Sequence, residues 1–214
     1  MRWRVGTAEA PLHNQDRSLV DLDLGLFGVF DGVGQFGNSG EAAELAARTI
    51  GWGCRSTSLA PTETLVASCE SADRTIRQAG LGATTATVAW VVDEGVIYVS
   101  VGDSRLYIQA AESAQLVQVT VDEGEGRILF NALGEGDNPH RSRVVSQMGR
   151  VALAAKSKLL LVTDGITGDY PPDLLTEQDL ARALQGDDPQ AAAEKLVAMA
   201  RKRDDKTALV VFLD

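Results

Sequence analysis

Runs of apolar residues, some alternating with polar ones, recur along the chain and predict β-strands. The first, residues 19–30, predicts one or two strands. Two stretches with helical spacing follow, at 39–50 and 61–80. A serine can cap the start of the first helix, and the second is bounded by Pro61 and Gly80.

The rest of the chain is richer in strand patterns. Strands are predicted at 83–93, 95–102, 105–109, 115–121, 151–155, 158–164 and 207–214. Asp93-Glu94-Gly95 indicates a hairpin, and two further helices fit 177–185 and 188–203. The glycine-rich, charged stretch 122–143 predicts a long mobile loop.

The order of these elements predicts the fold class. It runs strand, two helices, many strands, two helices and a final strand, which is not the strict alternation of a parallel sheet. We therefore predict an α+β fold with a central antiparallel β-sandwich flanked by helices. No repeat or linker divides the chain, so residues 1–214 are expected to form a single domain.

Composition and charge exclude some classes of function and location. The net charge of −10 argues against a nucleic-acid partner, because phosphate backbones need a basic face. The two N-terminal arginines precede no apolar run, and no stretch approaches the ~18 apolar residues of a membrane helix. Cys54 and Cys69 lack metal-site spacing and are expected to be reduced thiols. We therefore expect a cytoplasmic protein without a membrane partner.

Five aspartates share a setting that suggests chemistry. Asp31, Asp103 and Asp164 directly end apolar runs and are each followed by glycine or serine; Asp16 and Asp204 lie just outside such runs. One such residue usually begins a turn, but several favour an oxygen-ligand cluster for Mg²⁺ or Mn²⁺. Without cations, two carboxylates ~4 Å apart repel by about 4 kcal/mol at an effective dielectric near 20.

Residues 32–37 match G-x-G-x-x-G, a dinucleotide-binding pattern. That interpretation is disfavoured, because the following helix leads to another helix rather than to a second parallel strand. The glycines more readily allow a tight turn and backbone approach to a metal.

Six segments, in their order and rough spacing, resemble motifs of the protein phosphatase 2C family and together span nearly the whole chain. They are HNQDR (13–17), FGVFDGVG (27–34), GATTATVAWV (82–91), VGDSRLY (101–107), LLVTDGI (160–166) and DDKTALVV (204–211).

The resemblance implies a β-sandwich with helices on both outer faces and a two-metal site at one end. The metal ligands it implies are Asp16, Asp31, Gly32, Asp103, Asp164 and Asp204. Asp31 would bridge both ions, and the Gly32 carbonyl would bind one of them. Asp164 and Asp204 would hold the other.

Two of these ligands have subsidiary roles by the same resemblance. Asp16 would reach the site mainly through water, and Asp103 with Asp164 would form the third ion position found in bacterial members. Asp205 stands where many relatives have asparagine.

The chain departs from the family pattern around the substrate. Pro11 stands where the family usually has a phosphate-binding arginine; Arg17, Arg4 or Arg2 are candidate replacements, with Arg17 the first choice.

A general acid is also not evident in the sequence. Val33 follows the first Asp-Gly pair, where animal members have histidine. His13 and His140, the two histidines of the chain, are expected to be surface residues.

The resemblance implies a cytoplasmic, monomeric serine/threonine protein phosphatase of bacterial signal transduction that uses Mn²⁺ or Mg²⁺, with two ions or three. Its partners would be phosphorylated proteins, the products of serine/threonine kinases. A weakly active, metal-binding regulator that holds a phosphoprotein is the alternative, favoured by Pro11 and opposed by the complete aspartate set. A phosphatase dedicated to one regulatory partner, such as a sigma-factor antagonist, is a third.

Overall fold

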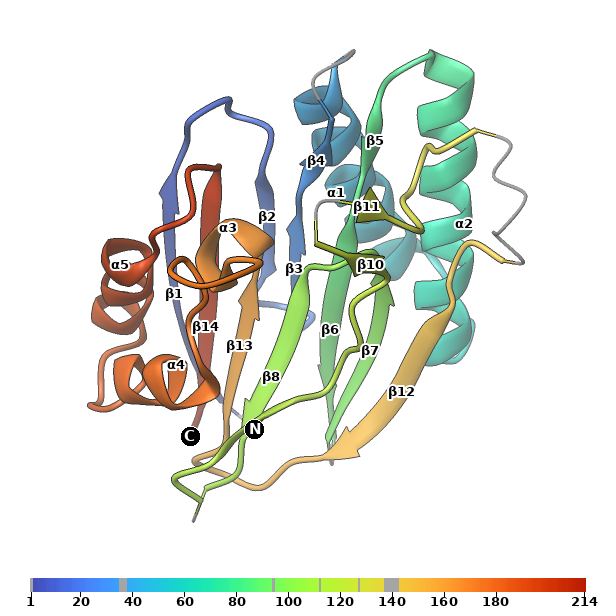
Figure 1. Ribbon diagram of the computed structural model, residues 1–214. Coiled ribbons are helices and arrows are strands. Elements are labelled where there is room, and N and C mark those ends of the chain that lie inside the picture. Colours follow the sequence, from blue (N-terminus) through green and yellow to red (C-terminus); the bar gives the residue numbers. More distant parts are fainter. Residues whose placement is uncertain (1, 35–37, 94, 112, 127, 137–142) are drawn as a thin grey trace.

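Two five-stranded antiparallel sheets pack face to face in the computed structural model, with helices on their outer faces (Figure 1). The structure describes residues 2–34, 38–93, 95–111, 113–126, 128–136 and 143–214. No helix in these ranges is both long enough and apolar enough to cross a membrane.

The first sheet has the order β1-β14-β13-β8-β9. Its strands are β1 (Trp3–Ala10), β14 (Lys206–Leu213), β13 (Lys158–Val162), β8 (Arg105–Gln109) and β9 (Leu116–Gln118). The second sheet has the order β12-β7-β6-β3-β2. Its strands are β12 (Gln147–Ala152), β7 (Gly95–Val101), β6 (Ala86–Val92), β3 (Leu26–Phe30) and β2 (Arg17–Asp21).

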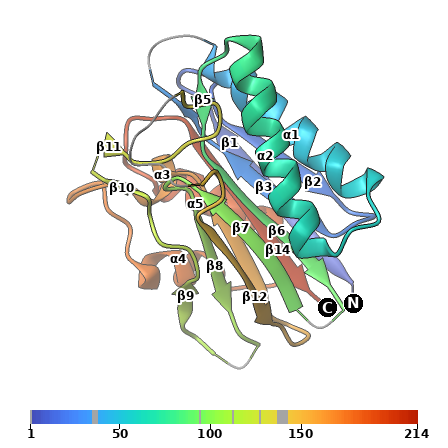
Figure 2. The same ribbon diagram turned by 90° about the vertical axis from the view of Figure 1, so that its right-hand side faces the viewer.

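Helices cover both outer faces, as two views show (Figures 1 and 2). α1 (Ser39–Ser56) and α2 (Pro61–Ala79) cover the second sheet, while α4 (Glu177–Ala183) and α5 (Pro189–Met199) cover the first. The remaining elements are short: β4 (Gly32–Val33), β5 (Ala83–Thr84), β10 (Gly124–Glu125), β11 (Ile128–Leu129) and α3 (Asp164–Thr167).

The alternation of side chains along a strand builds the layers. In β13, Leu159 and Leu161 pack between the two sheets, against Phe27 of β3. Leu160 and Val162 of the same strand face the helical layer of α4 and α5. Both faces of this strand are therefore buried, which explains its continuous apolar run. The predicted sandwich with helices on both faces is confirmed.

Several predicted boundaries were wrong. β1 was not predicted, because Trp3–Ala10 contains no apolar run; it forms by pairing with β14 along its whole length. α5 ends at Met199, so residues 200–203 are not helical as predicted.

The stretch 122–143 is also not simply a loop, because β10 and β11 pair within it. Two-residue strands have no periodicity for a sequence pattern to reveal. Residues 137–142, with His140, lie outside the described residues, as do residues 35–37 of the glycine motif and Glu94 of the hairpin signal. The hairpin itself is confirmed by the pairing of Val92 with Gly95.

Candidate metal and phosphate site

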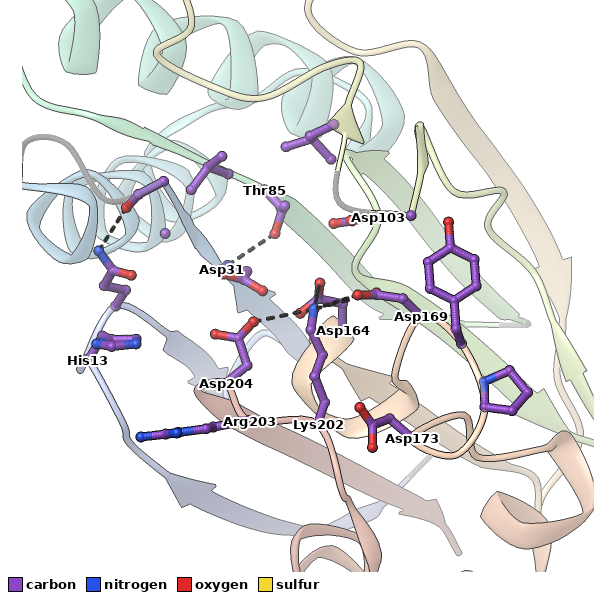
Figure 3. A pocket seen from close by; sticks show the side chains of 18 residues that line it. His13, Asp31, Thr85, Asp103, Asp164, Asp169, Asp173, Lys202, Arg203 and Asp204 are labelled. Carbon is purple, nitrogen blue, oxygen red and sulfur yellow. Dashed lines mark hydrogen bonds and ion pairs between the residues drawn. The ribbon is translucent and has the colours of Figure 1, made fainter.

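Aspartates from five separate connections gather at one end of the sandwich, and Figure 3 shows four of them, Asp31, Asp103, Asp164 and Asp204. Asp16 lies between β1 and β2, Asp31 follows β3, and Asp103 lies between β7 and β8. Asp164 is the first residue of α3, and Asp204 lies two residues before the first residue of β14. All but Asp16 line one cavity of about 520 Å³. The structure therefore brings together the aspartates that the sequence singled out.

Paired threonines before β6 hold the first Asp-Gly pair. The Asp31 carbonyl accepts hydrogen bonds from the Thr85 N–H at 2.8 Å and from the Thr84 hydroxyl at 2.9 Å. The Asp31 N–H donates to the Thr85 hydroxyl at 3.0 Å. Gly32 has no room for a side chain, because a Cβ there would lie 2.8 Å from the Gln15 carbonyl oxygen. These contacts fix the backbone on which the Asp31 carboxylate is carried.

Asp16 is buried behind the cavity wall, with 7% of its surface exposed. Its Oδ2 accepts a hydrogen bond from the Thr163 hydroxyl at 2.9 Å. Among the described residues, the buried Oδ1 atoms of Asp16 and Asp164 have no hydrogen-bond partner of normal geometry, although the Thr207 hydroxyl lies near enough to Asp16 to oppose the rise of its pKa. Buried polar atoms are normally partnered, so these oxygens call for a ligand. Hard carboxylate oxygens of this kind fit Mg²⁺ or Mn²⁺.

The electrostatics of the cluster support the same conclusion. Burial, followed by repulsion from Asp16 and Asp164, raises the pKa of Asp31 well above its usual range. Burial raises the pKa of Asp16 to about 7, and burial with repulsion from Asp164 does the same for Asp103. Burial also raises the pKa of Asp164, although Lys202 opposes this. Bound cations would favour the charged form of these groups.

Lys202 is a functional candidate that the sequence analysis missed. Its ammonium contacts Asp164 Oδ2 and lies 3.3 Å from Oδ2 of both Asp169 and Asp204. In the described part of the chain, no three acidic or metal-ligating side chains lie close enough to hold an ion as they stand. The sequence did not single out Lys202, because it falls in a predicted helix. It did not single out Asp169, because that residue belongs to no motif.

The basic residues at the site also differ from expectation. Arg203 and His13 line the cavity. The Arg17 guanidinium instead binds Glu44 at 3.1 Å and backbone carbonyls, and Arg4 pairs with the C-terminal Asp214. Among the described residues, the arginine that lines the cavity is Arg203, which follows α5 in a segment that the sequence predicts to be helical.

Asp205 shapes the chain that leads to Asp16. Its carboxylate accepts backbone N–H groups from residues 12–15, at 2.6 Å for His13 and Gln15. Although burial opposes it, this ring of donors lowers the pKa of Asp205.

Gly165 lies close to the backbone of Asp205: a Cβ at this position would lie 1.8 Å from the Asp205 carbonyl oxygen. The two Asp-Gly pairs therefore need glycine for close backbone approach.

Known proteins share this fold. The chain superimposes on "PppA, a key regulatory component of T6SS in Pseudomonas aeruginosa", with a TM-score of 0.82 and 20% identity over 100% of this chain and 99% of that one. The catalytic domain of the serine/threonine phosphatase PstP, solved with two manganese ions, gives 0.81 and 18% over 99% of each chain. MsPP from Mycobacterium smegmatis, solved with cacodylate, gives 0.79 and 23% over 99% and 98%.

Sequence comparison assigns the family. A search of curated protein sequences found no significant match. The family model for protein phosphatase 2C, however, matches residues 7–213, nearly the whole chain. This match agrees with the fold and with the motifs that form the aspartate cluster. The chain therefore belongs to the protein phosphatase 2C family.

Proposed function

We propose that this protein hydrolyses phosphoserine and phosphothreonine monoesters on other proteins with the help of bound Mn²⁺ or Mg²⁺. The observation that carries the proposal is the convergence of five aspartates on one end of the sandwich, where the buried Oδ1 atoms of Asp16 and Asp164 have no hydrogen-bond partner of normal geometry among the described residues. Membership of a metal-dependent phosphatase family supports it. Residues 1–214 would act as one catalytic domain.

The residues would share the ions as follows. Asp31 would bind both ions, the Gly32 carbonyl would bind one of them, and Asp164 with Asp204 would hold the other. Asp16 would act mainly through water, and Asp103 with Asp164 would provide a third position. When bound, such ions supply hydroxide from water near neutral pH and neutralise charge on the phosphoryl group.

A cysteine nucleophile is not part of the proposal. Cys54 and Cys69 are buried and unpaired, away from the cavity. Burial raises the pKa of Cys54 to about 12 and that of Cys69 still further, so both thiols stay protonated at neutral pH. Attack by water at the aspartate cluster is the chemistry that the site can support.

Arg203 is the residue that we assign to the substrate phosphate. It lines the cavity, is exposed to solvent, and makes no ion pair or hydrogen bond within the described residues. A guanidinium can hold two phosphoryl oxygens through parallel, charge-assisted hydrogen bonds. Arg203 would thus replace the arginine that Pro11 displaces. The weakly active regulator gains no support from any described contact.

Substitutions of the aspartates test the proposal. Asp164→Ala should lose Mn²⁺ binding by calorimetry and phosphate release from a phosphothreonine peptide together. Asp103→Ala should keep the core pair of ions but turn over more slowly. Asp23→Ala, which removes an exposed aspartate outside the cavity, is the matched control and should behave like the wild type. If Asp103→Ala lost all metal binding while Asp164→Ala kept it, the assigned roles would be wrong.

A further inference from the structure

The side chain of Lys202 occupies space among the carboxylates of the site. Its ammonium contacts Asp164 Oδ2 and lies 3.3 Å from carboxylate oxygens of Asp169 and Asp204 (Figure 3). Only 13% of the side chain is exposed. One positive charge thus stands against three negative ones in an enclosed setting, where charges are weakly screened.

Two of these three carboxylates, Asp164 and Asp204, are the ones assigned to a divalent ion. The oxygens that face the lysine are Oδ2 of both residues. An ammonium at hydrogen-bond distance from these oxygens and a divalent ion bound to them would repel each other at short range. Even an ion held through the Asp164 Oδ1 atom, which has no hydrogen-bond partner within the described residues, would lie beside the ammonium, so the two cations compete for these carboxylates.

We propose that Lys202 is a tethered competitor for the cation position between Asp164 and Asp204. The ammonium balances the carboxylates when no ion is bound, and it must move away before this position can take an ion. A lysine suits this role, because its ammonium is a point charge on a flexible four-carbon stem. The inference rests on the proposed function for the metal position, and it concerns how readily that position fills.

Manganese binding by a lysine variant tests the competition. Lys202→Met keeps the length of the stem and removes the charge. Its affinity for Mn²⁺, measured by calorimetry or by the EPR signal of free Mn²⁺, should be about tenfold higher than that of the wild type, equivalent to about 1.4 kcal/mol. Lys206→Met is the matched control: Lys206 donates to the Ala200 carbonyl at 3.2 Å and contacts none of the three carboxylates.

The control should bind Mn²⁺ as the wild type does. In chelator, Lys202→Met should also melt at a lower temperature than Lys206→Met, because the carboxylates lose their balancing charge. Equal Mn²⁺ affinities in all three proteins would overturn this inference but leave the proposed function intact. A failure of all three to bind Mn²⁺ would contradict both.

A second measurement uses the wild-type protein alone and so does not depend on the folding of a variant. Amine acetylation followed by mass spectrometry reports how accessible each lysine is. The acetylation rate of Lys202 should rise when Mn²⁺ is added to chelator-treated protein, while that of Lys206 stays constant. An unchanged rate at Lys202 in Mn²⁺-bound protein would show that the ammonium does not move, and the inference would fail.

Discussion

Arg203 is the arginine that lines the cavity within the described part of the chain. It lies between Lys202 and Asp204 in a segment that leaves α5 and turns toward the aspartates. Pro11 offers no side-chain donor to a phosphate, and Arg17 is held by Glu44. At the scale of single residues, we therefore propose that a side chain from the other end of the chain binds the substrate phosphate.

The Arg203→Ala variant should raise KM for a phosphothreonine peptide by about tenfold or more, since a hydrogen bond to a charged group is worth ~1.5–3 kcal/mol. The value of kcat should change less. Arg150→Ala removes an exposed arginine of β12 and serves as the control. Introducing Pro11→Arg into Arg203→Ala should recover part of the loss. An unchanged KM in folded, metal-loaded Arg203→Ala would exclude this assignment.

The segment between β1 and β2 shows how an element positions the site. Residues 12–15 turn their N–H groups onto the carboxylate of Asp205, and this turn delivers Asp16 to the cluster. Asn14 adopts a left-handed conformation within it, with φ of 60°. A single acidic side chain beside β14 therefore organises a segment distant from it in sequence.

Removing this carboxylate should loosen the segment. Asp205→Ala leaves the partly buried N–H groups of residues 12–15 without their acceptor and should lower the free energy of unfolding in urea by about 2–3 kcal/mol. Asp205→Asn keeps one acceptor oxygen and should cost less. Asp214→Ala, which breaks the exposed ion pair with Arg4, should cost under about 1 kcal/mol. A loss from Asp205→Ala no larger than that from Asp214→Ala would refute the role given to Asp205.

Elements with strong local patterns were predictable, and those made by distant contacts were not. β13 and β14 are continuous apolar runs because both of their faces are buried. β1 lacks such a run and depends on its pairing with β14. The charged segment 200–205 could continue a helix or leave it, so its sequence alone did not reveal the end of α5.

The same distinction holds for the site. Asp31, Asp103 and Asp164 were found because each ends an apolar run. Lys202 was missed because its contacts with Asp164 and Asp169 join residues 38 and 33 positions apart. Such contacts arise from the tertiary fold, and no local sequence pattern predicts them.

At the scale of the whole molecule, the fold gathers several carboxylates at one end of the sandwich, where their mutual repulsion destabilises the folded protein unless cations are bound. Loops from both halves of the chain meet at one end of the two sheets. Asp16 is buried there, Asp31, Asp103 and Asp164 are partly buried, and the Asp204 side chain is 39% exposed. The net charge of −10 adds to the repulsion. The stability of the metal-free protein should therefore depend on pH in the opposite sense to that of the metal-bound protein.

In chelator, the melting temperature should fall as pH rises from about 4 to about 7. The pKa values of Asp16 and Asp103 are raised from 3.8 to about 7 in the folded protein, so the folded state binds more protons than the unfolded state over this range. Stability is therefore full below the unfolded pKa and is lost as pH rises through the folded one. With Mn²⁺ the trend should reverse, because deprotonation favours the ion. Asp103→Asn should show a shallower fall in chelator, and an equal slope would contradict the assignment.

Phosphate release from a phosphothreonine peptide, measured in one sample before and after restoring the metal, tests the central claim most directly. Protein treated with EDTA should release no phosphate above background, and adding excess Mn²⁺ to the same sample should restore turnover. Undiminished release in EDTA, or no release at any Mn²⁺ concentration from protein that binds the ion, would contradict a metal-dependent phosphatase.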